Sequence, residues 1–149
     1  MDDSDSFELS TFTPFLLNQA AEAQSDVFSA NYRSRYGMLR TEWRVLFHLG
    51  RNKSLTAKEI SERASIHKTK VSRAVRALEE KRFLTRTVSS DDRRSERLSL
   101  RPPGQEAFRV LTRAARDYEA SLEKRLGKRD ARKLRQLLQK LAVSQSAQA

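Results

Sequence analysis

The segment from His67 to Lys81 combines an apolar stripe with a cationic face. Its apolar residues recur at helical spacing and predict a buried stripe over Val71, Ala74, Val75 and Leu78. The polar residues on the opposite face are His67, Lys68, Thr69, Lys70, Ser72, Arg73 and Arg76. Arginine can donate two hydrogen bonds to O6 and N7 of guanine, and serine or threonine can bond to base edges or phosphates. No acidic residue precedes Glu79 on this helix, whereas a purely solvated face mixes both charges, so the pattern favours contact with DNA.

The neighbouring segments predict the elements that position this helix. Residues 56–64 begin with a capping box, formed by Thr56 and Glu59, and predict a short helix before a tight turn. The hydroxyl and backbone amides at Thr56 are suited to a DNA phosphate. Residues 83–88 and 96–100 predict two short strands joined by a polar turn. Two short helices followed by a hairpin predict a winged helix-turn-helix.

The predicted hairpin carries a second group of cations. Its strands hold Arg86 and Arg97, and its tip holds Arg93 and Arg94. A basic tip can enter the minor groove, where narrow A·T-rich geometry enhances the negative potential. We expect Asp92 to pair with an arginine and to hold the shape of the tip rather than to contact DNA. The alternative interpretation of the hairpin, taken alone, is a charged surface turn.

The distribution of charge points to a polyanionic partner. The chain has 149 residues, a net charge of +11 and a pI of about 10.5. Residues 1–30 contain six acids and no base, so the rest of the chain carries a net charge of +17. Residues 67–101 contain 11 basic and 5 acidic residues. This excess of positive charge around the predicted recognition elements favours nucleic-acid binding over a basic surface kept for solubility.

The residue inventory argues against catalysis, metal binding and membranes. The chain has no cysteine and only two histidines, His48 and His67, so we expect no disulfide, thiolate chemistry or conventional zinc site. It lacks a Ser-His-Asp ordering, a glycine-rich phosphate loop and paired carboxylates framed by a pocket. No apolar run approaches the length of a membrane span, and no signal peptide is recognisable. We therefore expect a cytoplasmic protein that is not an enzyme and needs no cofactor or metal.

Helices are also predicted before the winged segment. Residues 13–35 carry apolar side chains at alternating steps of four and three, with Thr13 as the expected N-cap and Gly37 as the end. A second helix over 40–49 is expected to close at Gly50. The apolar content is modest for helices of this length, which indicates that a partner chain completes their burial.

Two more helices are predicted after the hairpin. A break at 102–104 precedes a long helix over 105–126, and Gly127 separates it from a last helix. The last helix has one apolar face, formed by Leu134, Leu137, Leu138 and Leu141. Residues 1–10 and 143–149 are expected to be disordered tails.

In this order of elements the chain resembles the MarR family of bacterial transcriptional regulators. The segments that carry the likeness are Tyr36–Leu46, Leu55–Ser61, Lys70–Val75 with Leu78 and Glu79, and Asp92–Ser95 with Leu98 and Leu100. The likeness covers about residues 12–142 and implies a mainly helical domain over 11–142 with a small β-hairpin wing. It also implies dimerisation helices at 11–36 and 103–142, on either side of a DNA-binding lobe at 37–101.

The resemblance implies a homodimeric repressor that blocks a near-palindromic operator in double-stranded DNA, as a nucleoid-associated protein of the bacterial cytoplasm. Its two recognition helices would enter successive major grooves. It also implies a small aromatic or phenolic effector in the crevice between the dimer region and the winged lobe, which would weaken DNA binding. Tyr32, Tyr36, Trp43 and His48 lie on the elements that would line this crevice. For each of the four, ordinary core or interface packing is the favoured interpretation.

Three positions depart from the family pattern. Leu39 stands where the family often has a helix-capping threonine, and residues 101–103 replace the usual Leu-Thr start of the long helix. Arg82 replaces the glycine that usually ends the recognition helix, which would be strained if its φ is positive. None of these positions belongs to the predicted DNA-contacting face.

Two other functions are compatible with a basic winged helix. A non-specific architectural protein that binds DNA or RNA would show the same charge without selectivity between sites. A protein-interaction module could use the same fold, but it would not need a face made of cations and hydroxyls alone.

Overall fold

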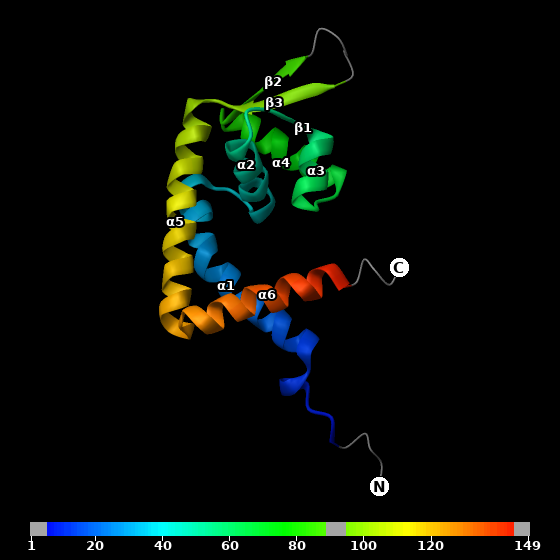
Figure 1. Cartoon of the computed structure of the whole chain (residues 1–149). Helices are drawn as coiled ribbons and strands as arrows, with labels where there is room; N and C mark the ends of the chain where they lie inside the picture. The colour runs from blue at the N-terminus through cyan, green and yellow to red at the C-terminus, as the bar shows by residue number, and fades with distance from the viewer. Residues whose placement is uncertain (1–5, 89–94, 145–149) are drawn as a thin grey trace. The chain divides into compact units, whose positions relative to one another are not determined.

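Six α-helices and three short strands make up the described part of the chain, residues 6–88 and 95–144 of a computed structural model (Figure 1). The chain divides into two units, residues 1–109 and 110–149. The first unit contains α1 (Thr13–Tyr36), α2 (Arg40–Arg51), β1 (Leu55–Thr56), α3 (Ala57–Ala64), α4 (Lys68–Glu80), β2 (Leu84–Val88), β3 (Glu96–Leu100) and the start of α5 (Pro102–Leu126). The second unit contains the rest of α5 and α6 (Lys128–Ser144).

The predicted winged helix-turn-helix is confirmed. Helices α3 and α4 form the two-helix segment, and β2 and β3 form the antiparallel wing that extends from it (Figure 1). Strand β3 is central in a three-stranded sheet of order β1-β3-β2, in which Leu55 lies opposite Leu98 and Leu84 lies opposite Leu100. Strand β1 was not predicted, because two residues are too few to show an alternating pattern.

The core beneath the wing is built by α2, α3, α4 and the sheet. The four predicted stripe residues of α4 are all buried, which confirms the helical spacing read from the sequence. Other fully buried side chains of this core include Leu46, Leu49, Leu55, Ile60, Leu84 and Leu98. The stripe anchors α4 against this core and leaves its opposite face in solvent.

Two predicted helix ends in the first unit are wrong. Helix α1 begins at Thr13, and its N-cap is Phe12, because the carbonyl of Phe12 accepts the first helical bond from the amide of Leu16 at 3.0 Å. Gly50 does not close α2 but lies inside it, and the helix continues to Arg51. A Cβ on Gly50 would lie 2.1 Å from the ring of Phe108, so this glycine is needed for close packing and not for a turn.

Residues 102–104 were predicted as a break but form the first turn of α5. Proline is tolerated there because the first amides of a helix have no intrahelical acceptor. Gly104 permits close approach to Phe83, the residue before wing strand β2, since a Cβ would lie 2.1 Å from the carbonyl oxygen of Phe83. That carbonyl also accepts a bond from the amide of Arg101 at 2.8 Å. The sequence Arg-Pro-Pro-Gly therefore starts the helix rather than delaying it.

Of the two unusual capping positions, Leu39 is explained by a local contact and Arg82 is strained. Leu39 is the N-cap of α2 without a side-chain acceptor, but its amide donates to the carboxylate of Glu42 at 2.8 Å. Arg82 has a φ of 62°, in the left-handed region that favours glycine, so the expected backbone strain is present. Gly37 and Gly127 end α1 and α5 as predicted.

The second unit is a pair of helices joined by ion pairs. Arg135 of α6 bonds to Glu119 at 2.8 Å and to Glu123 at 3.1 Å, both on α5. Hydrogen bonds to Glu123 and Glu119 raise the pKa of Arg135, so it remains charged. The predicted apolar face of α6 is exposed in the single chain, with side chains between 38% and 48% accessible at Leu134, Leu137, Leu138 and Leu141. No described helix is both long enough and apolar enough to cross a membrane.

Candidate nucleic-acid interface

The outward face of α4 presents the predicted cations and hydroxyls together. All seven residues predicted for this face are exposed, while the four stripe residues between them are buried. The burial pattern therefore fixes the rotation of the helix about its own axis. Within residues 6–88 and 95–144, Lys68, Lys70 and Arg73 have no ion-pair partner, whereas Arg76 pairs with Glu80 at 3.7 Å. The free cations lie near the N-terminal half of the helix.

His67 caps this helix and is a functional candidate at the same time. Its ring Nδ1 accepts a hydrogen bond from the amide of Thr69 at 3.2 Å. This bond requires Nδ1 to be unprotonated, which leaves Nε2 as the protonated nitrogen of the neutral ring. An exposed Nε2–H at the start of α4 is a donor available to a base edge or a phosphate.

The turn between α3 and α4 is held tightly. Ser65 has a φ of 53° and closes α3, and the amide of Ile66 donates to the carbonyl of Ser61 at 3.2 Å. The hydroxyl of Ser61 donates to the carbonyl of Ile66, and the guanidinium of Arg44 donates to the carbonyl of Ala64. These bonds fix the angle between the two helices and so the direction in which α4 points.

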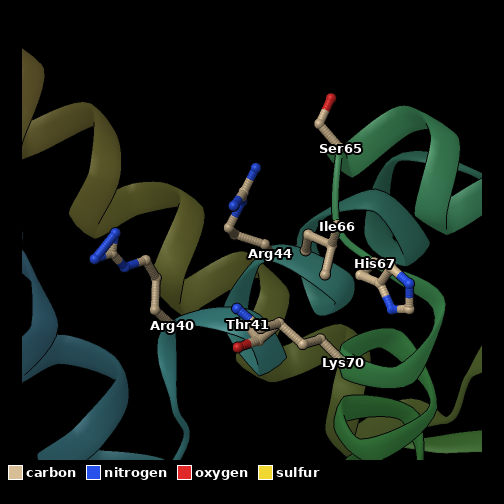
Figure 2. A pocket seen from close by; sticks show the side chains of 7 residues that line it. All are labelled: Arg40, Thr41, Arg44, Ser65, Ile66, His67 and Lys70. Carbon is tan, nitrogen blue, oxygen red and sulfur yellow. The ribbon is translucent and has the colours of Figure 1, made fainter.

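A pocket of about 410 Å³ lies beside the start of α4, and we call it the basic pocket. Its lining residues are Arg40, Thr41, Arg44, Ser65, Ile66, His67 and Lys70. Figure 2 shows Arg44 between Arg40 on one side and the turn of Ser65 to His67 on the other. Arg40, Thr41 and Arg44 were not predicted from the sequence, because the pocket joins two segments more than twenty residues apart. One signal was present: an arginine in the first turn of a helix, where acidic side chains are preferred.

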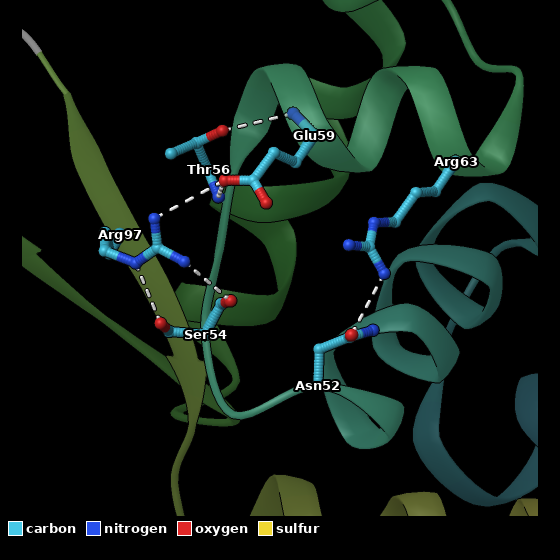
Figure 3. Close-up of polar contacts among 6 residues, drawn as sticks. All are labelled: Asn52, Ser54, Thr56, Glu59, Arg63 and Arg97. Carbon is cyan, nitrogen blue, oxygen red and sulfur yellow. Dashed lines mark hydrogen bonds and ion pairs between the residues drawn. The ribbon is translucent and has the colours of Figure 1, made fainter.

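Arg97 connects the wing to the loop before α3 (Figure 3). Its guanidinium donates to the hydroxyl of Ser54 at 2.8 Å, to the carbonyl of Ser54 at 3.0 Å and to the carboxylate of Glu59 at 3.4 Å. Glu59 in turn accepts from the amide of Thr56 at 3.3 Å, while the hydroxyl of Thr56 accepts from the amide of Glu59 at 3.1 Å. The predicted capping box is confirmed, and Arg97 extends it into the sheet.

The electrostatics of this network favour the charged form of Glu59. The hydrogen bond from the backbone of Thr56 lowers the pKa of Glu59, and the positive charges of Arg97 and Arg63 lower it further. Arg63 also donates to the side-chain carbonyl of Asn52 at 3.0 Å (Figure 3). Arginines thus hold the segment that leads into α3, Arg63 at Asn52 and Arg97 at Ser54.

Arg86, on the other wing strand, is also engaged within the chain. Its guanidinium bonds to Glu79 of α4 and to Glu96 of β3, each at 2.9 Å. The hydrogen bond to Glu96 raises the pKa of Arg86, as does the bond to Glu79, so the arginine remains charged. Of the other wing residues predicted to contact or support DNA binding, Asp92, Arg93 and Arg94 lie outside the described residues.

Comparisons with known proteins agree with this geometry. Residues 36–95, from the end of α1 to the start of β3, match the model of the MarR family. A MarR/EmrR family transcriptional regulator from Acinetobacter sp. ADP1 is 26% identical, with a TM-score of 0.80 over 96% of this chain and 100% of that chain. The winged helix-turn-helix lobe therefore matches the MarR family in sequence, and the chain has the fold of a MarR-family regulator. No curated protein matches it in sequence.

Two other solved structures with this fold contain a bound partner. The transcriptional repressor CouR, bound to a 23-mer DNA duplex, is 25% identical, with a TM-score of 0.82 over 91% of this chain and 95% of that chain. NadR, in complex with 4-hydroxyphenylacetate, is 22% identical, with a TM-score of 0.71 over 89% of this chain and 94% of that chain. The second likeness is evidence for the fold alone.

The four predicted ligand residues do not form one cluster of direct contacts. Tyr32 is buried and its ring is nearly parallel to that of Trp43, with centroids 6.5 Å apart. Trp43 also contacts Phe47, which contacts His48. Burial lowers the pKa of His48, and the charges of Arg44 and Arg63 lower it further, so the neutral ring is favoured. Tyr36 lies apart, with its ring against that of Phe83.

Proposed function

We propose that this protein is a sequence-specific transcriptional regulator that binds double-stranded DNA, and that it acts as a repressor by occupying its operator. The observation that carries the proposal is the exposed face of α4, where Lys68, Lys70 and Arg73 have no ion-pair partner among the described residues. Unpaired cations beside exposed hydroxyls can bond to bases and phosphates without first breaking an internal contact. CouR, a relative with the same fold, was crystallised on a DNA duplex.

The acting form in this proposal is a homodimer. The apolar face of α6 is exposed, and so is the apolar stripe predicted for α1, in which Leu16 is 44% accessible and Val27 is 65% accessible. Apolar faces of this extent on single helices are unusual in a monomer and typical of an interface. A two-fold dimer presents two copies of α4, so the operator should be a near-palindrome with half-sites about one helical turn apart.

The proposal gives the wing residues two different roles. Arg86 and Arg97 are positioning residues, because their guanidinium groups are already bonded within the chain. Arg93 and Arg94 at the tip are the candidates for minor-groove contact. Thr56 remains a candidate phosphate contact through its hydroxyl, which accepts from the amide of Glu59 and can still donate, whereas its amide is bonded to Glu59.

A small aromatic or phenolic effector is a further part of the proposal. NadR, which shares the fold, binds 4-hydroxyphenylacetate. In this chain the ring contacts among Tyr32, Trp43 and Phe47 lie where α1 meets α2, and a planar aromatic molecule could replace one of them. Because the rings contact one another directly, their packing role is sufficient to explain them, and ligand binding needs its own measurement.

The proposal is tested by the change of Arg73 to alanine. Arg73 is exposed on α4 and lies at the centre of the contacting face. If it donates to a guanine, Arg73→Ala weakens binding to the operator by about 1–3 kcal/mol and leaves binding to a scrambled duplex nearly unchanged. Fluorescence anisotropy on both duplexes measures the difference. Arg33→Ala, which removes an exposed cation from α1, is the charge-matched control.

Two results would contradict parts of this proposal. An equal loss on both duplexes would show that Arg73 contacts only phosphate. A wild-type protein that binds all duplexes equally would be a non-specific architectural protein, and the assignment as a regulator would be wrong.

A further inference from the structure

We propose that the basic pocket holds a phosphate group of the DNA backbone, next to the groove that α4 enters. The inference rests on the proposed DNA binding and adds Arg40, Thr41 and Arg44 to the contact surface. Two residues of the pocket, His67 and Lys70, also belong to the exposed face of α4. Any group that fills the pocket is therefore adjacent to DNA bound by that face.

The chemistry of the lining selects an anion. Three side chains that carry a fixed positive charge, Arg40, Arg44 and Lys70, surround the space together with His67, and the lining contains no acidic residue. None of the four has an ion-pair partner within the part of the chain that the structure describes. The hydroxyls of Thr41 and Ser65 add donors of the kind that bond to phosphate oxygens.

The lining also excludes the aromatic effector as the occupant. Pockets for drug-like organic molecules are lined mostly by apolar and aromatic side chains with a few polar groups. Here Ile66 is the one apolar residue of the lining, and its side chain is buried beneath the turn. The pocket is thus suited to a small, strongly hydrated oxyanion that is held by charge.

The position of Arg40 indicates that its charge serves a ligand. It is the first residue of α2, where the helix dipole opposes a positive side chain. A cation at this place weakens the helix unless it gains a contact elsewhere. Arg44 lies one turn further along, and its bond to the carbonyl of Ala64 holds its guanidinium against the helix-turn-helix. The two arginines therefore approach one space from the same helix face.

The experiment compares Arg40→Gln with wild type by anisotropy on operator and scrambled duplexes over a salt series. Loss of one phosphate contact makes the slope of log K against log salt shallower by about 0.9 for each pocket engaged. We expect that change on both duplexes, with an affinity loss of about tenfold, because a phosphate contact carries no sequence information. Arg40→Lys should restore most of the slope, since a point charge satisfies a phosphate.

The control is Arg33→Gln, which removes the same charge from an exposed position on α1 outside the pocket. It should leave the slope within error of wild type. A slope for Arg40→Gln equal to that of Arg33→Gln would overturn the proposal. Unfolding in urea checks the fold, and Arg40→Gln should be no less stable than wild type because it removes a cation from a helix start.

A free phosphate ion has the same chemistry as a phosphate of the DNA backbone, so its binding to the pocket is tested separately. Inorganic phosphate is titrated against the protein–duplex complex at constant ionic strength. Displacement of the duplex from wild type, combined with an unchanged slope for Arg40→Gln, would assign the pocket to a free anion and overturn the backbone contact. If wild type shows no salt-dependent DNA binding at all, both the proposed function and the backbone contact of the pocket are overturned.

Discussion

Replacing Arg97 by methionine or lysine distinguishes two roles for this residue. Arg97 either holds the wing through contacts within the chain or contacts DNA directly from its strand. Arg97 makes two hydrogen bonds to Ser54 and one ion pair with Glu59. The side chain of Arg97 is 43% accessible and that of Glu59 is 37% accessible. A half-exposed ion pair contributes about 0.2–1 kcal/mol, and a hydrogen bond contributes about 0.5–1.5 kcal/mol net. With a discount for exposure, the loss of the network should lower the free energy of unfolding by about 1–2 kcal/mol.

The lysine variant makes the test specific. Lysine keeps the charge but lacks the planar fork that reaches both atoms of Ser54 and the carboxylate of Glu59 together. We therefore expect Arg97→Lys and Arg97→Met to be destabilised by similar amounts in urea denaturation. All samples are compared at one protein concentration, because the stability of a dimer depends on it.

DNA binding of the same two variants completes the prediction. If Arg97 only positions the wing, both variants keep the wild-type slope of affinity against salt, although affinity falls as the wing loosens. If Arg97 contacts a phosphate, Arg97→Met loses about 0.9 from that slope and Arg97→Lys keeps it. A methionine variant with wild-type stability and a shallower slope would refute the structural reasoning.

Further predictions concern three positions around the winged helix. Gly50→Ala should destabilise the protein by about 1–3 kcal/mol despite the better helix propensity of alanine, because the new methyl overlaps Phe108. Phe108→Leu should restore part of this loss in a double-mutant cycle measured by urea denaturation. Arg82→Gly should stabilise by about 1 kcal/mol, because it relieves the positive φ, and an unchanged thermal midpoint would argue against strain there. The pKa of Glu59 is lowered in the folded protein, mainly by the hydrogen bond from the amide of Thr56. The charged carboxylate therefore stabilises the fold fully above the ordinary pKa of 4.5, and this stabilisation is lost as pH falls through the lowered pKa. Glu59→Gln should flatten that part of the acid unfolding curve, and an unchanged curve would exclude the capping box as its cause.

The helix-turn-helix could be predicted from the sequence because its information is local. The apolar spacing of Val71, Ala74, Val75 and Leu78 sets which face of α4 is buried, and the remaining residues must then face solvent. The capping box of Thr56 and Glu59 is likewise complete within four residues. Patterns of this kind depend on neighbours along one helix and do not require knowledge of the tertiary contacts.

The positions that were missed depend on contacts between distant segments. Gly50 was predicted to end a helix because glycine is common there. Its actual role depends on the ring of Phe108, which lies more than fifty residues later in the chain. The partners of Arg97 at Ser54 and Glu59 are also remote, 43 and 38 residues earlier in the chain, so the sequence indicated a free cation where the structure has a bonded one. The basic pocket combines Arg40 and Arg44 of α2 with the start of α4, and only the packed fold brings these charges together.

The central claim, sequence-specific recognition of DNA, is tested most directly by selection from a random duplex library. Anisotropy on the selected and scrambled duplexes then measures the preference. Recognition by two copies of α4 should yield a near-palindromic motif with half-sites about one helical turn apart and a preference of at least about 10³-fold at physiological salt. No enriched motif and equal affinity for all duplexes would contradict it, because α4 would then contact the backbone alone.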